Sequence, residues 1–183
     1  MKISVEIEDA AFDKASKMLT EVPGGIEQAS ASVLNKALQA GRTTGVREVT
    51  KRYTIKAKDV RPAIELRRAK KSDLGAEMFI SGTNISMKRF AHKPAADTTG
   101  ANRKPVRMAR KVGAWENVER GFVWRGHVFQ REGRGRLPIE KQFGPSVPGM
   151  FGNDQIVDKI EDKMVEVVDK QLEHETNRIL NKY

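Results

Sequence analysis

Three prolines at positions 138, 145 and 148 separate a region of short β-type runs from a long helical run at the C-terminal end. Each proline fixes φ and removes a backbone donor, which makes this stretch unsuited to the interior of a helix or a sheet. Just before it, Gly133 and Gly135 loosen a strongly basic segment. We therefore expect residues 131–152 to form a Gly/Pro-rich loop with a basic tip.

The same stretch carries apolar side chains that can dock against a core, namely Leu137, Ile139 and Phe143. A loop with anchored walls and a mobile basic tip is a common place for function. A rigid connection between a sheet and the last helix is an equally simple interpretation, and both remain open on physical grounds alone.

Residues 153–183 predict a C-terminal helix, capped by Asn153 or Asp154 and running to about Asn181. Its acidic residues come early and Arg178 and Lys182 come late, which suits the helix dipole. The apolar positions recur at helical spacing. They are Ile156, Ile160, Met164, Val167, Val168, Leu172, Ile179 and Leu180.

Residues 26–51 predict a second long helix, whose apolar face consists mainly of small residues. Small residues allow another element to approach closely, and we favour core packing over an oligomer contact for this face. Upstream, alternation over residues 2–8 predicts a strand, and residues 10–19 predict a short helix capped by Asp9. Residues 53–61 predict a turn and a short helix.

Further strands are expected at residues 63–68, 76–81, 106–112 and 122–129, the last with Gly126 as a bulge. We therefore predict an α+β fold, in which a small antiparallel sheet packs against two long helices within a single domain of residues 1–183. Residues 91–104 contain almost no apolar side chains and predict a mobile loop.

The charge balance favours an anionic partner. The 183 residues include 34 Lys and Arg against 24 Asp and Glu, a net charge of +10. Such a surplus suits nucleic acid or an acidic protein. The absence of Cys removes disulfides, thiolate catalysis and Cys-ligated zinc, and fits a reducing cytosol. The alternating N-terminus is not expected to be a signal peptide, and no apolar run approaches a membrane span.

No constellation of residues indicates an enzyme, a metal site or a cofactor. His92, His127 and His174 lack ligand spacing, and residues 174–178 resemble only half of a zinc-protease motif. Trp115 and Trp124 are expected at the core or edge of the sheet rather than on a base-stacking platform.

Basic residues cluster at several places, and two clusters are the candidates for a DNA path: Arg67, Arg68, Lys70 and Lys71 in one, and Arg131, Arg134 and Arg136 in the other. A single cluster is usually a solvated surface. Several clusters in one small protein suggest that a polyanion passes nearby, bound without sequence preference.

The run from Arg136 to Pro148, Arg-Leu-Pro-Ile-Glu-Lys-Gln-Phe-Gly-Pro-Ser-Val-Pro, followed by a long charged helix, resembles the minor tail protein Z family of phages and prophages. The first half agrees, with Val-Pro-Gly-Gly at residues 22–25 and Leu-Asn-Lys-Ala at residues 34–37. The resemblance extends from about Pro23 onward.

The resemblance implies a non-enzymatic protein that acts in tail completion at the head-proximal end of the tail. It implies an α+β fold, a ring of subunits in the virion, other tail or neck proteins as partners, and double-stranded DNA close by. The virion tail is the expected location, after assembly in the cytoplasm of the bacterial host. A non-specific nucleic-acid-binding protein of another class is the alternative.

Ring subunits meet head to tail, so one surface must fit a different surface on the next subunit. The Pro-rich stretch has the character of such a surface, because its prolines reduce the entropy lost on docking. The candidates for this contact are Leu137, Pro138, Ile139, Phe143, Gly144, Pro145, Val147, Pro148 and Phe151.

Overall fold

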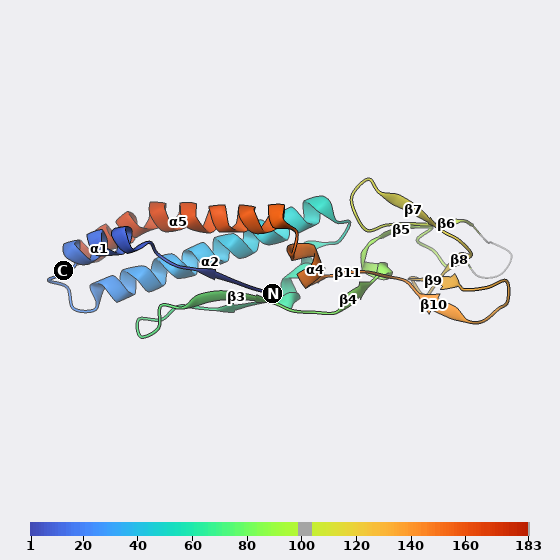
Figure 1. The fold of residues 1–183 in the computed structure, drawn as a ribbon, viewed down its shortest axis with the longest axis horizontal. Helices are drawn as coiled ribbons and strands as arrows, with labels where there is room; N and C mark the ends of the chain where they lie inside the picture. The colour runs from blue at the N-terminus through green and yellow to red at the C-terminus, as the bar shows by residue number, and fades with distance from the viewer. Residues whose placement is uncertain (99–103, 183) are drawn as a thin grey trace. The chain divides into compact units, whose positions relative to one another are not determined.

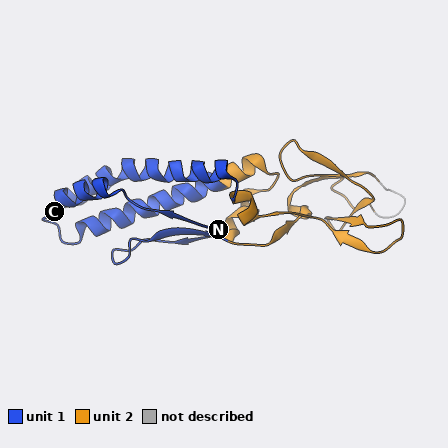
Figure 2. Cartoon of the chain, in the orientation of Figure 1, with its two compact units in different colours: residues 1–45, 64–80, 152–183 blue, residues 46–63, 81–151 orange. Residues whose placement is uncertain are grey.

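The computed structural model describes residues 1–98 and 104–182. The fold is α+β, with two long helices and small antiparallel sheets, as the sequence predicts (Figure 1). The chain forms two compact units (Figure 2). Unit 1 comprises residues 1–45, 64–80 and 152–183, and unit 2 comprises residues 46–63 and 81–151. The expectation that both units fold as one domain stays a prediction.

Unit 1 contains the helices α1 (Asp9–Met18) and α5 (Asp154–Leu180) and most of α2 (Gly25–Arg52). Both long helices lie where their periodicity places them. The stripe expected on α5 is largely buried, and the small residues Ala29 and Ala37 of α2 are fully buried. Gly41 allows α5 to approach, because a Cβ there would overlap the side chain of Met164. The small face of α2 therefore packs in the core.

The sheet of unit 1 has the strand order β1-β3-β2 and is antiparallel throughout. Its strands are β1 (Lys2–Val5), β2 (Ile64–Arg67) and β3 (Ala76–Ile80). In the register, Ile3 faces Met78 and Ile64 faces Ile80, and all four side chains are buried. Strand β1 contacts α5, so one side of the sheet faces the helices.

Unit 2 begins with the end of α2 and the short helices α3 (Ala57–Val60) and η1 (Arg61–Ala63). Three small antiparallel sheets follow, with orders β5-β6-β7, β10-β9-β8 and β11-β4. The elements are β4 (Asn84–Ser86), η2 (Met87–Arg89), β5 (Ala91–Lys93), β6 (Val106–Ala109), β7 (Trp115–Val118), β8 (Gly121–Trp124), β9 (His127–Arg131), β10 (Ile139–Lys141), β11 (Phe143–Ser146) and α4 (Val147–Phe151). The core of unit 2 includes Val60, Met87, Phe90, Val123, Val128, Met150 and Phe151.

The strands expected to share one sheet therefore lie in different sheets. Residues 63–68 and 76–81 pair in unit 1, whereas residues 106–112 and 122–129 contribute to two separate sheets of unit 2. The run 122–129 is a hairpin, not one strand. Arg125 and Gly126 both have positive φ, 51° and 72°, which is the backbone of a two-residue type I′ turn. Gly126 thus lies in a turn, and the expected bulge is wrong.

The expected loops contain regular structure. Residues 91–93 form β5, and Thr98 is buried, where its Oγ1 accepts a hydrogen bond from the backbone N–H of Val123 at 2.8 Å. Residues 99–103 of the expected mobile loop lie outside the described residues. Residues 131–152 include β10 and β11, which pair with β9 and β4 despite the prolines, and the short helix α4.

Candidate nucleic-acid interface

A cationic cleft lies at the turns of the sheet β8–β9–β10 in unit 2. Its volume is about 750 Å³. It is lined by Thr98, Lys104, Arg120, Gly121, Phe122, Arg131, Gly133, Arg134, Gly135 and Arg136. Five of these described residues are cationic and none is acidic, so the cleft has the charge of an anion-binding site.

Tight turns bring the arginines of the cleft together. The β9–β10 hairpin pairs Arg131 with Ile139, and its loop carries Arg134 and Arg136. Arg120 is in the turn that precedes β8 and has a φ of 53°. Residues other than glycine rarely adopt this backbone conformation, and those that do cluster at functional sites. Among the described residues only Arg120 and Arg125 do so, and both lie in turns flanking β8.

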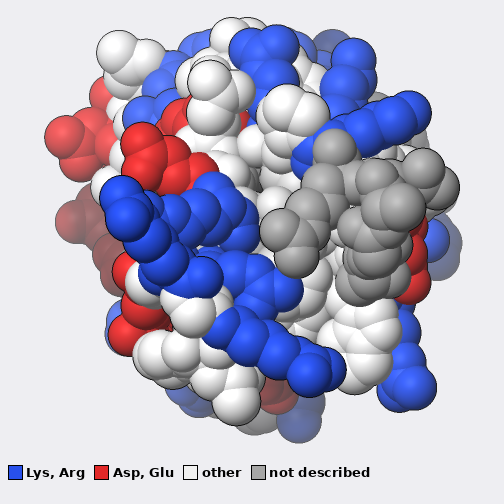
Figure 3. Space-filling model, turned by 90° about the vertical axis from the view of Figure 1, so that its right-hand side faces the viewer, with Lys and Arg blue, Asp and Glu red and all other residues white. Residues whose placement is uncertain are grey.

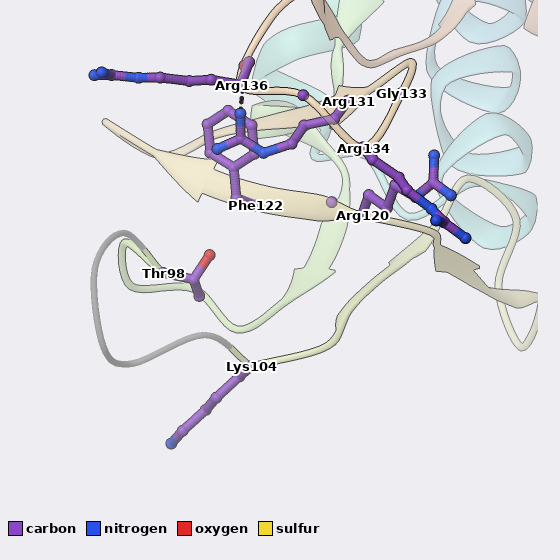
Figure 4. A pocket seen from close by; sticks show the side chains of 10 residues that line it. Thr98, Lys104, Arg120, Phe122, Arg131, Gly133, Arg134 and Arg136 are labelled. Atoms are coloured by element: carbon purple, nitrogen blue, oxygen red, sulfur yellow. Dashed lines mark hydrogen bonds between the residues drawn. The ribbon is translucent and has the colours of Figure 1, made fainter.

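Arg131 is the most strongly positioned cation of the cleft. Its guanidinium carbon lies 4.7 Å from the centroid of the Phe122 ring, and Nη1 donates to the carbonyl oxygen of Arg136 (Figure 4). Figure 4 shows Arg120 and Arg134 projecting on one side and the side chains of Lys104 and Arg136 extending outward. These outward cations can reach phosphates that pass over the cleft.

The cations other than Arg131 are available to a ligand. Within the part of the chain that the structure describes, Lys104, Arg120, Arg134 and Arg136 form no ion pair with a carboxylate. Figure 3, which faces the end of unit 2, shows Lys and Arg side chains running across the front, with most Asp and Glu at one edge. Salt-dependent binding of a polyanion is the chemistry that this surface supports.

The other predicted basic cluster lies on the β2–β3 hairpin of unit 1. Arg67 contacts Asp73 at 2.7 Å and Glu77 at 3.2 Å, and the hydrogen bond to Asp73 is the main reason that the pKa of Arg67 is raised. The backbone N–H of Gly75 and then Arg67 lower the pKa of Asp73. Arg68, Lys70 and Lys71 are exposed. Carboxylates thus partly neutralise this cluster, unlike the cleft.

The predicted subunit-contact residues divide into an exposed group and a buried group. Leu137, Ile139 and Phe143 are exposed, Leu137 by 71%, and the Leu137–Pro138 peptide is cis. By contrast, Val147 and Phe151 are in the core of unit 2. Gly144 is also enclosed, because a Cβ there would overlap the ring of Phe90. Pro145 and Pro148 are half-buried. The free apolar surface is therefore residues 137–143.

The sequence interpretation missed the aromatic side chains around the cleft. Phe122 lines it, and Trp124, expected at the core or edge of the sheet, is 44% exposed. The sequence signal for these rings is that aromatic residues alternate with valines along residues 121–124 and 127–131, on either side of a Gly-containing turn. Among the described residues no group of three or more His, Asp or Glu could hold a metal ion, and no helix is both long and apolar enough to cross a membrane.

Comparison with protein families gives one informative result. The family described as Prophage minor tail protein Z matches residues 11–183. The chain belongs to this family. Members of the minor tail protein Z family are structural components of phage and prophage tails, so this chain is a tail protein that functions with other tail proteins in the virion. Neither the curated proteins nor the solved structures gave a significant match.

Proposed function

We propose that this minor tail protein acts in tail completion at the head-proximal end of the tail, as a non-enzymatic subunit of a ring close to the DNA. The observation that carries the proposal is the cleft in unit 2, with five cations and no carboxylate among the described lining residues. A protein at the head-proximal end meets the DNA as it enters the tail, and phosphate contacts there need charge without sequence recognition.

The exposed apolar segment supports the ring. Leu137, Ile139 and Phe143 project from unit 2 without being covered, and Lys141 Nζ lies 5.5 Å from the centroid of the Phe143 ring. A head-to-tail ring requires each subunit to present such a surface to a different surface of its neighbour. Assembly in the host cytoplasm and contacts with neck or tail proteins belong to the same proposal.

The cleft would serve a free nucleic-acid-binding protein of another class equally well. The two functions predict different locations for the protein after phage assembly. A tail protein is retained in the purified virion, whereas a free nucleic-acid-binding protein remains in the cell lysate.

Complementation of a phage that lacks this gene tests the proposal. We expect the intact chain to restore infectivity and to be found, by immunogold labelling of purified tails, at the head-proximal end. A variant with Arg131→Ser, Arg134→Ser and Arg136→Ser should be incorporated normally but should restore fewer infectious particles, because it lacks three of the phosphate-contacting cations.

The matched control is Arg68→Ser, Lys70→Ser and Lys71→Ser, which removes the same charge from the partly neutralised cluster of unit 1. Absence of the intact chain from tails, or labelling at the end far from the head, overturns the tail-completion role. Full complementation by the Arg131, Arg134 and Arg136 variant overturns the role of the cleft.

A further inference from the structure

One face of the sheet β8–β9–β10 carries a row of aromatic rings. Side chains alternate along each strand, so the burial of Val123 and Val128 places Phe122, Trp124, His127 and Phe129 on the opposite, outer face. The register sets Phe122 against Phe129 and Trp124 against His127. This outer face is not the core, because Trp124 is exposed and the other three rings are half-buried.

The rings form a single cluster centred on Phe129. Its ring centroid lies 5.4 Å from that of Phe122, 6.1 Å from that of Trp124 and 6.4 Å from that of His127. The Phe122 and Phe129 rings are nearly parallel, at 17°. His127 contributes an uncharged ring at neutral pH, because burial and then the charges of Lys141 and Lys88 lower its pKa.

Cations surround these rings on the same face. The guanidinium carbons of Arg125 and Arg131 each lie 4.7 Å from an aromatic centroid, over Trp124 and Phe122 respectively. Lys141 faces Phe129 in the register, and Ile139 faces Arg131. Of the described residues whose side chains alternate onto this face, none is acidic; Glu140 faces Gln130 and lies on the other side.

We infer that this outer face binds single-stranded DNA by stacking unpaired bases on Trp124, the exposed ring of the cluster. Phe122 and Arg131 belong to both the face and the cationic cleft, so bases on the rings would leave their phosphates beside the cleft. The inference rests on the proposed DNA contact of the cleft and adds the form of DNA that it holds.

The chemistry of the face selects this ligand. In a duplex the flat faces of the bases are stacked on one another, whereas unpaired bases can stack on exposed aromatic and guanidinium planes. An acidic protein would satisfy the charge but would not need an exposed flat ring, Trp124, beside the phosphate-binding cations. The combination of flat rings and cations without carboxylates therefore favours a single strand.

Fluorescence anisotropy with end-labelled 16-nucleotide probes tests the inference on the intact chain. The three probes are a mixed-sequence single strand, its duplex, and a strand of the same length with abasic sites in place of the bases. We expect Trp124→Ala to weaken binding of the single strand by about 5- to 150-fold, since stacking contributes about 1–3 kcal/mol per base. Duplex binding should change less than about twofold, because duplex contacts use only the cations.

Two further variants make the result specific. Trp124→Phe keeps a stacking ring and should retain most of the affinity for the single strand. Trp115→Ala is the matched control: Trp115 is 36% exposed and is also covered by cations, Lys93 at 5.3 Å and Arg107 at 5.9 Å, but it belongs to the sheet β5–β6–β7. Trp115→Ala should leave binding of the single strand unchanged. Unaltered circular dichroism verifies that each variant is folded.

The outcomes separate this inference from the proposed function. Equal binding of the abasic and normal strands, or equal effects of Trp124→Ala on single strand and duplex, overturns the inference and leaves the cleft's phosphate contacts intact. Failure of all three probes to bind overturns both the inference and the cleft's role. If Trp124→Ala instead lowers incorporation into tails with DNA binding unchanged, the face docks a protein and the inference is wrong.

Discussion

Glu175 is a buried carboxylate near the C-terminal end of α5, in unit 1. Lys36 of α2 donates to its Oε1, and Arg178 donates to its Oε2 from Nε at 2.9 Å and Nη2 at 2.6 Å. Burial opposes ionisation of this group, but the hydrogen bonds from Lys36 and Arg178 outweigh it, so the pKa of Glu175 lies below its ordinary value of 4.5. A lowered pKa in the folded state means that the ionised carboxylate stabilises the fold above pH 4.5.

Glu175→Gln should therefore lower the free energy of unfolding at pH 7 by about 1–3 kcal/mol, because two cations lose their anionic partner. Both cations are partly exposed and can be rehydrated, which favours the lower end of this range. The stabilisation begins to be lost as the pH falls below 4.5, so the difference between parent and variant should be smaller at pH 3 than at pH 7. Urea unfolding followed by circular dichroism at both pH values measures the difference.

Glu166→Gln is the matched control for this prediction. Glu166 pairs with Lys163 at 2.7 Å on the same helix, but its side chain is 60% exposed. Exposed pairs contribute little to stability, so this variant should unfold like the parent at both pH values. A difference between Glu175→Gln and parent that persists undiminished at pH 3 contradicts the assignment to the carboxylate charge.

At the scale of elements, the stretch from Leu137 to Phe151 contains two short strands and a helical turn with opposite burial. Strand β10 and the start of β11 present apolar side chains to solvent, whereas α4 inserts Val147, Met150 and Phe151 into the core of unit 2. The beginning of the stretch is thus exposed, and its end secures the stretch to the rest of unit 2.

Phe143→Ser and Phe151→Ser should consequently behave differently. Phe143 is 43% exposed, so its replacement should leave the melting temperature nearly unchanged and lower incorporation into tails. Phe151 is fully buried, so its replacement should cost about 3–5 kcal/mol of stability and lower incorporation through unfolding. Thermal melts and complementation measure the two effects. Full complementation by a stable Phe143→Ser variant would show that the exposed segment makes no essential contact.

Elements with long regular periodicity were predictable from the sequence, and short paired elements were not. The stripes of α2 and α5 extend over many turns, so their ends agree with the structure to within a few residues. Strands β5, β10 and β11 contain only three or four residues. Their pairing depends on partners far away in the sequence, which a local pattern does not contain.

The candidate interface was predictable in its charge but not in its aromatic part. Arg131, Arg134 and Arg136 lie close together in the sequence and line one cleft. The ring cluster depends on the turn at Arg125 and Gly126, which reverses the chain and sets Phe122 against Phe129. An arginine at positive φ is uncommon, so the sequence alone predicts a single strand over residues 122–129 and does not reveal its outer face.

At the scale of the whole molecule, the question is whether the net charge of +10 or the arrangement of that charge governs DNA binding. Each phosphate contact contributes about −0.9 to the slope of log K against log salt for a duplex. Removing Arg131, Arg134 and Arg136 together should make this slope shallower by about 2–3.

Removing Arg68, Lys70 and Lys71 lowers the net charge by the same three units and should change the slope much less, because Asp73 and Glu77 lie beside that cluster whereas no carboxylate is among the described residues that line the cleft. Measuring duplex binding at salt concentrations from about 50 to about 200 mM gives the slope for each variant, and the two slopes are then compared. Equal changes in slope would indicate that the net charge alone attracts DNA and that the cleft has no special role.

The distribution of tryptophan gives the two units separate optical signals. The sequence has two tryptophans, Trp115 and Trp124, and both belong to unit 2, whereas helices α1 and α5 and most of α2 belong to unit 1. Tryptophan fluorescence therefore follows unit 2. The circular dichroism of the helices, at about 222 nm, mainly follows unit 1. One unfolding experiment with both detectors records the cooperativity of the chain: coincident transitions mean that the units unfold as one domain, and separated transitions assign a stability to each.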